Sequence, residues 1–240
     1  MELKILGSGS KGNSYLLKPK EGKSLLIECG LTWKKTKKEL DYDLNIAGCI
    51  ATHEHFDHIK CYNDVMKAGI PFYCSYGTAT ALKLISNHNL KERDKVNIGD
   101  FIVLVFGVDH DAAQPLGFII NHPECGNIVF ATDTKSLNHK FGNINHWIIE
   151  ANYSETIMME ELEEEQLSGH LANRIYDNHM SLETCINVLK ENELFQTRTI
   201  TLIHLSSKNA WGDMFIDMVS RMVGIKPYIA EKGLIVNLDL

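Results

Sequence analysis

Residues 52–58 constrain this chain more than any other stretch. They follow the pattern HxHxDH, which brings three imidazoles and one carboxylate into six consecutive residues: His53, His55, Asp57 and His58. Imidazole suits zinc and carboxylate oxygen suits zinc or manganese, so each side chain is a good ligand for a divalent metal ion. The apolar run directly before them, 46–51, predicts a short buried strand. We therefore predict a metal site on a loop at the end of a strand, a common place for reactive groups.

Three further candidate ligands follow at long intervals. His110, Asp133 and His204 each come soon after an apolar run that predicts a strand. A lone histidine at a strand end is more often an exposed polar residue, and an isolated HxH is often a coincidence. The residues alone leave these alternatives open, and the order of the three candidates behind the HxHxDH cluster becomes informative only beside the family resemblance described below.

The composition is that of an ordinary globular protein. The chain has 240 residues, of which 44% are apolar and 23% charged, enough for a single domain over 1–240 with a full core. No apolar run approaches the ~20 residues of a membrane span, and the N-terminus lacks the layout of a signal peptide. We therefore expect a cytoplasmic protein without a membrane partner. Six irregularly spaced cysteines, with no CxxC pair, predict free and mostly buried thiols.

The net charge of −7 argues weakly against a duplex substrate, because proteins that grip long nucleic acid usually carry a basic face. One dense basic patch is present at 34–38, and an acidic run lies at 160–165. Both patterns are typical of solvated helix faces, although the lysines would also suit a row of phosphates.

The hydrophobic pattern predicts an α/β protein without repeats or linkers. The predicted strands are 2–6, 14–17, 24–30, 71–74, 101–106, 118–121, 127–131, 146–153 and 199–203, with two short strands inside 226–238. The predicted helices are 32–40, 61–68, 78–88, 155–170, 181–192 and 213–223. Periodicity alone does not separate one α/β layering from another.

With this set of ligands the chain resembles the metallo-β-lactamase superfamily, whose signature is HxHxDH followed by His, Asp and His. The resemblance implies a four-layer αββα sandwich that holds two divalent metal ions. It assigns one ion to His53, His55 and His110, the other to Asp57, His58 and His204, and a bridging position to Asp133. Zinc is the metal expected from the number of imidazoles, with manganese as the alternative.

The resemblance also implies a chemistry. Two such ions lower the pKa of a shared water toward neutrality and neutralise charge on the substrate oxygens. Asp57 is expected to orient the attacking water, and Glu28, where relatives usually carry Asp, to support the metal loop. His179 is the candidate general acid, because it precedes a predicted helix whose N-terminus favours an anion. His170 is its weaker rival, and a solvated helix-cap histidine is the alternative.

Substrate contacts are predicted in two polar loops. Residues 7–13 are rich in Gly and Ser, so their backbone N–H groups can face an anion, with a simple hairpin turn as the alternative. Lys11 and Asn13 from this loop, and Ser206 and Asn209 beyond the last ligand, are the candidate substrate-binding residues.

Longer motifs indicate a branch of the superfamily. GSGSKGN at 7–13, HDAAQPLG at 110–117, ATDT at 131–134 and HLS at 204–206 resemble the YycJ/WalJ group, and EANY at 150–153 and NHMSLET at 178–184 resemble its short phage-type members. That likeness implies a homodimeric phosphodiesterase for cyclic nucleotides such as cCMP and cUMP, a phage counter-defence of the anti-Pycsar type. The alternative is a DNA or RNA nuclease with the same metal centre. A lactone or thioester hydrolase, or a metal-stabilised binding protein, ranks behind both.

Overall fold

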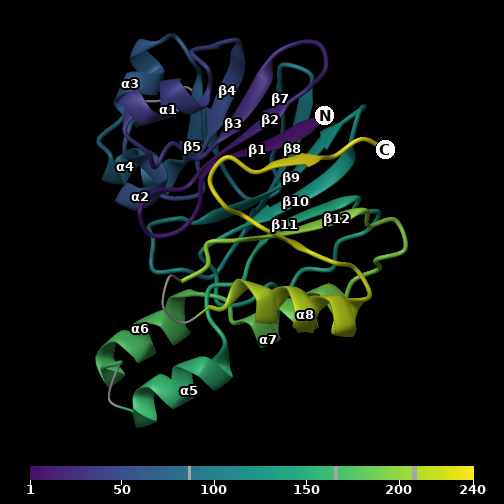
Figure 1. Cartoon of the computed structure of the whole chain (residues 1–240). Helices are drawn as coiled ribbons and strands as arrows, with labels where there is room; N and C mark the ends of the chain where they lie inside the picture. Colours follow the sequence, from purple (N-terminus) through teal and green to yellow (C-terminus); the bar gives the residue numbers. More distant parts are fainter. Residues whose placement is uncertain (86–87, 165–166, 207–209) are drawn as a thin grey trace.

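The structure is a computed structural model that describes residues 1–85, 88–164, 167–206 and 210–240. Within these residues, two sheets of seven strands each pack face to face (Figure 1). In spatial order, the first sheet consists of β14 (Ile235–Asn237), β1 (Glu2–Gly7), β2 (Ser14–Lys18), β3 (Ser24–Ile27), β4 (Ile46–Ile50), β5 (Phe72–Ser75) and β6 (Asn89–Leu90). The second consists of β13 (Tyr228–Ile229), β12 (Thr199–Ile203), β11 (His146–Glu150), β10 (Gly126–Ala131), β9 (Leu116–His122), β8 (Phe101–Gly107) and β7 (Lys95–Ile98).

Helices cover the outer face of each sheet (Figure 1). The first sheet carries α1 (Trp33–Glu39), α2 (Phe56–Ile59), α3 (Tyr62–Lys67) and α4 (Tyr76–Ala81), and the second carries α7 (Leu182–Lys190) and α8 (Gly212–Val223). The layers therefore run helix, sheet, sheet, helix, which confirms the predicted αββα sandwich. A further pair, α5 (Glu155–Glu163) and α6 (Gly169–Asn178), projects from one end of the second helix layer. Each helix of the described segments is too short or too polar to span a lipid bilayer.

The core lies between the sheets because the strands are apolar on both faces. In β3, Leu25 and Ile27 belong to the core between the sheets, whereas Leu26 packs with Cys49 beneath the helices of the first sheet. This alternation follows from the two-residue period of a strand. Burying one such leucine or isoleucine stabilises the fold by roughly 1.5–3 kcal/mol. The six cysteines are all buried and unbonded, as the sequence predicts.

Parallel pairing gathers the functional segments at one edge of the sandwich. Strands β3, β4 and β5 run parallel, and so do β10, β11, β12 and β13. Because the carboxyl ends of parallel strands meet at the same edge, the loops that follow them come together there. The topology thus explains how ligands far apart in sequence reach a common rim.

The acidic segment 155–170 is not the single helix that the sequence predicts. Helix α5 ends at Glu163, and α6 begins at Gly169, where the Ser168 side chain caps it by accepting a hydrogen bond from the backbone N–H of Leu171. The prediction was wrong because an N-cap serine lies inside a run of helix-forming residues. The two helices pack through a small apolar cluster: Tyr153, Met158, Leu167 and Ala172.

The predicted helix 78–88 is also too long. Helix α4 ends at Ala81, and Lys83 takes a left-handed conformation (φ 55°) that ends the helical turn. Residues 86–87 lie outside the described part of the chain. Strands β6 and β7 were not predicted, because β6 has only two residues, one of them polar, and β7 alternates polar and apolar residues over only four positions. The other predicted strands and helices are present, with boundaries that move by up to a few residues.

Candidate metal centre

The HxHxDH segment is half loop and half helix. His53 and His55 lie on the loop after β4, as predicted, whereas Asp57 and His58 belong to the single turn of α2, where His55 is the N-cap residue. Glu28 fixes the start of this loop, since its Oε1 accepts a hydrogen bond from the backbone N–H of Thr52 at 3.1 Å. The predicted support from Glu28 is therefore present in the geometry.

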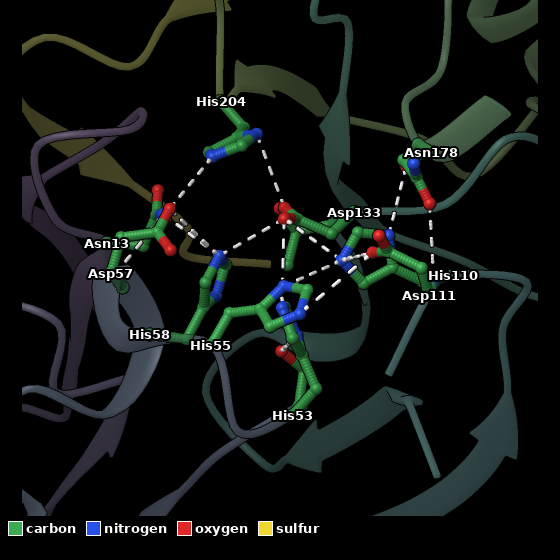
Figure 2. Close-up of polar contacts among 12 residues, drawn as sticks. Asn13, His53, His55, Asp57, His58, His110, Asp111, Asp133, Asn178 and His204 are labelled. Atoms are coloured by element: carbon green, nitrogen blue, oxygen red, sulfur yellow. Dashed lines mark hydrogen bonds and ion pairs between the residues drawn. The ribbon is translucent and has the colours of Figure 1, made fainter. Parts of the chain in front are cut away.

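The first group of donor atoms comes from His53, His55 and His110, whose ligand nitrogens all lie within 4.8 Å of one another (Figure 2). His55 Nδ1 lies 3.1 Å from His110 Nε2. His53 Nε2 is buried and has no hydrogen-bond partner among the described residues. A buried nitrogen without a partner is destabilising unless a ligand satisfies it, and a metal ion would do so.

The second group comes from Asp57, His58 and His204. Asp57 Oδ2 lies 3.5 Å from His58 Nε2 and 3.6 Å from His204 Nε2. Within the described ranges, the buried His204 Nε2 also lacks a hydrogen-bond partner. The second group therefore repeats the arrangement of the first, with a carboxylate in place of one imidazole.

Asp133 lies between the two groups (Figure 2). Its Oδ2 is 3.3 Å from His58 Nε2, 3.7 Å from His110 Nε2 and 3.8 Å from His53 Nε2. One oxygen of this buried carboxylate thus faces donors of both groups. The structure brings all seven predicted ligands together. Two of the donor groups are those that the resemblance implies, and two others overlap with them: His53 with His58 and Asp133, and Asp133 with Glu150, His179 and His204.

In two of the histidines, a contact made by ring nitrogen Nδ1 determines whether the other nitrogen, Nε2, can bind a metal ion. His110 Nδ1 donates to the backbone carbonyl of Asn178 at 3.2 Å, and His204 Nδ1 faces Glu150 Oε1 at 3.0 Å. At His110 this contact places the ring proton on Nδ1 and leaves an Nε2 lone pair directed at the cluster. At His204 the Nε2 lone pair becomes available to a metal ion when the ring gives up its second proton. Metal-binding histidines are typically oriented in this way, so the residues present fit a pair of divalent cations.

The imidazoles and carboxylates of the cluster shift one another's pKa values, because they are buried close together. Burial lowers the pKa of His204, but Asp133 and the contacts with Asp57 and Glu150 outweigh burial and raise this pKa to about 10. Burial raises the pKa of Asp57, but the close imidazoles of His204 and His58 outweigh burial and hold that pKa well below its usual range. Buried carboxylates thus remain ionised and attract positive charge, which protons or divalent cations can supply.

Glu150 is an important residue that sequence reasoning assigned no role. This fully buried carboxylate accepts hydrogen bonds from the backbone N–H groups of Thr134 (3.0 Å) and Met180 (3.3 Å). It also lies 2.7 Å from His179 Nδ1 and 3.0 Å from His204 Nδ1. The signal that would have found it is an acidic residue at the end of a buried apolar strand, where an unpaired charge is not tolerated.

Three residues of the site have a backbone conformation that side chains rarely adopt. Glu28, Asp133 and His204 follow the ends of β3, β10 and β12 with φ values of 62°, 47° and 56°. Left-handed backbone at such residues costs on the order of 1–3 kcal/mol each and persists only where the surroundings enforce it. At His204 the backbone N–H donates to Ser8 Oγ at 2.8 Å, which is one such constraint.

His179 lies between two helices. It is the residue that follows α6, with extended backbone, and two residues separate it from the predicted helix α7, which begins at Leu182 behind the capping Ser181. The partner of its side chain is Glu150, whose Oε1 lies 2.7 Å from His179 Nδ1. Its side chain also lines the cavity above the cluster. Burial lowers the pKa of His179, but the Glu150 carboxylate outweighs burial and raises it. His170 is exposed on α6 and is absent from the cavity lining.

A cavity of about 270 Å³ opens over the donor groups. Its lining residues are Ser10, His55, Asp57, His110, Asp111, Asp133, Leu171, Arg174, Ile175, Asn178, His179 and His204. Helix α6 supplies four of them, at positions 171, 174, 175 and 178. Sequence reasoning missed this wall, although the i, i+3, i+4, i+7 spacing is that of one helix face. Arg174 adds an exposed guanidinium that makes no ion pair with another described residue.

The four predicted substrate contacts have different surroundings. Lys11 does not line this cavity, whereas its neighbour Ser10 does. Asn13 is buried, and its Nδ2 lies 3.1 Å from His58 Nε2 and 3.4 Å from Asp57 Oδ2, so it braces the metal loop. Ser206 donates its backbone N–H to the carbonyl of Asn152 and does not line the cavity. Asn209 lies outside the described residues.

Comparisons with known proteins agree with this geometry. Residues 23–205 match the family model of the Beta-lactamase superfamily domain. The exodeoxyribonuclease YycJ of Bacillus anthracis is 28% identical over 251 aligned residues, which cover 97% of this chain and 90% of that protein. The exodeoxyribonuclease WalJ of Streptococcus pneumoniae serotype 2 is 29% identical over 229 residues, covering 85% of this chain and 81% of that protein.

A solved structure supports the fold alone. The metallo-β-lactamase fold protein YhfI from Bacillus subtilis superposes with a TM-score of 0.74 at 17% identity, covering 98% of this chain and 99% of that one. The two sheets and their helix layers are therefore shared across nearly the whole length of both chains.

Proposed function

Because the chain belongs to the metallo-β-lactamase superfamily, we propose that it is a metal-dependent phosphodiesterase that hydrolyses DNA. One observation carries the proposal: seven donor side chains form two groups joined by Asp133, beneath a cavity that also presents a guanidinium. Two divalent cations held there would activate water and neutralise charge on a phosphate. Lactones and thioesters, which carry no negative charge at the reacting centre, would make no use of Arg174.

We assign the orientation of the attacking water to one side chain and the protonation of the leaving oxygen to another, while the proton that the water loses passes to solvent. Asp57 lies on the cavity wall as a carboxylate and orients the attacking water for attack on phosphorus. As the bond between phosphorus and the leaving sugar oxygen breaks, His179 gives that oxygen a proton. Glu150 holds His179 through Nδ1, which leaves Nε2 as the nitrogen available to substrate.

The choice of DNA is supported by the relatives rather than by the cavity. Two proteins similar over most of the chain are named exodeoxyribonucleases. We therefore propose that the substrate is a DNA strand with a free end. Zinc is the metal that we propose first, since five of the seven donors are imidazoles, with manganese as the alternative.

A cleavage assay tests this function. Purified protein loaded with zinc or manganese is incubated with end-labelled linear single strands, linear duplexes and a closed circular single strand. We expect a ladder or mononucleotides from linear DNA and no cutting of the circle. Asp133→Asn, which keeps the shape and removes the bridging charge, should abolish the products. If the linear strands stay intact with either metal, the protein is not a DNA exonuclease.

A second candidate substrate, a 3′,5′-cyclic nucleotide, is favoured by the size of the cavity. The cavity has a volume of about 270 Å³ and is closed on one side by α6, so it holds little more than one nucleotide. It is at the small end of ligand sites, which usually have volumes of roughly 300–1,000 Å³. Incubation with cCMP, cUMP, cAMP and cGMP, followed by chromatography, would detect the linear monophosphates. Turnover of a cyclic nucleotide at a higher kcat/KM than of DNA would make this the main function.

We further propose that the protein works as a cytoplasmic homodimer. Large apolar side chains on α5 and α6 remain exposed: Met159 is 62%, Leu171 45% and Tyr176 49% exposed. A second copy of the chain would cover this surface. Light scattering should therefore give twice the mass of 27.1 kDa, and Tyr176→Glu should give the monomer.

A further inference from the structure

The loop formed by residues 7–13 separates two cavities. On one side Ser10 lines the cavity over the metal ligands. On the other side Gly7, Ser8, Lys11 and Gly12 line a second cavity of about 420 Å³. Ser8 takes part in both environments, because its Oγ also accepts the backbone N–H of His204 at 2.8 Å. Whatever occupies the second cavity therefore lies one loop away from the metal ligands.

The second cavity has an apolar floor and a basic rim. Leu6, Leu31 and Ala230 supply the apolar surface. Lys11, Lys35 and Lys232 supply three ammonium groups, against one carboxylate, Glu231. This composition differs from that of the first cavity, in which imidazoles and carboxylates predominate. It offers no set of donors for a metal ion and suits an anion attached to an apolar body.

Two of the three lysines make no ion pair with the described residues. Lys232 Nζ lies 2.8 Å from Glu39 Oε1, so its charge is partly neutralised. Lys11 and Lys35 are exposed and make no ion pair within the described part of the chain. An ammonium group that lacks a carboxylate partner is available for a phosphate oxygen.

The loop that separates the cavities is held in place by its glycines. Gly12 has φ +135°, and a Cβ there would lie 2.5 Å from the carbonyl oxygen of Gly30. Asn13, the next residue, donates its backbone N–H to the carbonyl of Asp57 at 2.7 Å. Glycine is required where backbones approach so closely, so Lys11 is carried on a segment fixed to the metal loop.

We propose that this second cavity binds a neighbouring nucleotide of a single-stranded DNA substrate, with its phosphate on Lys11 and Lys35 and its base against Leu31 and Ala230. Single-strand binding sites combine ammonium or guanidinium groups for the backbone with a surface, usually aromatic, for the base, and here two aliphatic side chains take the place of the aromatic ring. The inference rests on the proposed function, since it concerns DNA as substrate. It also explains how an acidic protein holds a polyanion: the contact needs only a local basic rim, which α1 and the loop supply.

The test is a binding measurement that does not depend on cleavage. Fluorescence anisotropy of labelled deoxythymidine oligomers of two to twelve nucleotides, in EDTA, gives Kd as a function of length and salt. The variants are Lys35→Glu and, as a matched control, Lys67→Glu. Lys67 is an exposed lysine on α3 that lines neither cavity. We expect Lys35→Glu to weaken binding of the long oligomers about tenfold at low salt. The slope of log K against log salt should become shallower by about 0.7, one phosphate contact.

The outcomes separate this inference from the proposed function. If the wild type binds the twelve-nucleotide oligomer more tightly than the dinucleotide but cleaves neither, the proposed function is overturned and the second site stands. If the wild type cleaves DNA while Lys35→Glu and Lys67→Glu bind every length equally well, the second site is overturned and the function stands. Lys11→Glu provides a second, independent variant on the same rim, with the same expected loss.

Discussion

At the scale of single residues, the site depends on which ring nitrogen each histidine presents. Glu150 and the carbonyl of Asn178 occupy the far nitrogens of His204 and His110, and thereby direct the other nitrogens inward. These contacts are absent from any motif, because they join strand ends and a helix end that are distant in sequence. They lead to two predictions about individual side chains.

Glu150→Gln should weaken metal binding about 10–100-fold, the usual effect of removing a carboxylate that orients a metal-binding histidine. The amide keeps the shape of Glu150 but not the charge that faces His204 Nδ1 at 3.0 Å. Competition with a chromophoric zinc chelator measures the affinity. Glu191→Gln, which removes an exposed carboxylate paired with Lys140, is the control. Equal affinities in the two variants would mean that Glu150 does not orient His204.

His179→Gln should lower kcat by roughly 10²–10⁴, the usual contribution of a general acid, and leave the metal content unchanged. The matched control is His170→Gln, because His170 is exposed and does not line the cavity. Steady-state kinetics combined with elemental analysis of the same samples distinguishes the two histidines. A larger loss in His170→Gln than in His179→Gln would reverse the assignment.

At the scale of elements, helix α6 determines the shape of the cavity. It contributes one wall, and its last carbonyl positions His110. Arg174→Ala should therefore raise KM for DNA about tenfold while changing kcat less, since an exposed guanidinium mainly contributes to binding the phosphate. Arg221→Ala on α8, where the arginine pairs with Asp217, is the control. Unchanged kinetics in Arg174→Ala would remove α6 from substrate binding.

Strand β11 contains a buried histidine that should make stability depend on pH. Burial lowers the pKa of His146 to about 4, and its Nδ1 contacts Thr199 Oγ1 at 2.8 Å. The unfolded chain, with a pKa near 6.5, binds the proton first, so the folded state loses stability as pH falls from 6.5 to 4. The expected loss is on the order of 3 kcal/mol for this group.

Urea unfolding of the wild type and of His146→Gln at pH 7 and pH 4.5 measures this effect. The wild type should lose more stability than the variant between the two pH values, because glutamine does not titrate. An equal decrease in the free energy of unfolding of both proteins would show that groups other than His146 cause the loss of stability at acidic pH.

The sequence predicted the elements marked by a short apolar run or a clear period and missed those with neither. Residues 24–27, 127–131 and 199–203 are short, mostly apolar runs, so their strands were found. The face of α6 turned to the cavity mixes Leu171, Arg174 and Asn178, which gives no apolar stripe to detect. The HxHxDH ligands were predicted because they are neighbours in the sequence, and the three distant ligands were predicted from the resemblance to the metallo-β-lactamase superfamily. The roles of Glu150 and Arg174 exist only after folding brings α6 and β11 together.

At the scale of the whole molecule, both sheets share one core, and we propose that residues 1–240 unfold as a single domain. Leu25 and Ile27 of the first sheet lie in the same apolar cluster as Ile128 and Phe130 of the second. Calorimetry should therefore give one transition with equal calorimetric and van't Hoff enthalpies. Two separate transitions would indicate that the sheets unfold independently.

Metal removal should lower the melting temperature of this single unit. A ligand that binds only the folded state, at a concentration a hundred times its Kd, raises the free energy of unfolding by about 2.7 kcal/mol. A bound metal ion would also coordinate the buried Nε2 atoms of His53 and His204, which lack hydrogen-bond partners among the described residues. Melting curves in excess zinc and in excess EDTA give the difference. Identical curves would contradict a cation site built from residues of both sheets.

The left-handed backbone of Glu28, Asp133 and His204 has a consequence for anyone who engineers this protein. A library selected only for survival of heating in excess EDTA, where bound metal does not add stability, should accumulate glycine or asparagine at these positions, since both relax the chain there. The selected variants would resist heat better and have lower catalytic activity. At positions 28, 133 and 204, thermal stability and catalytic activity therefore make opposite demands. A redesign that aims to keep the activity should retain the native residues there.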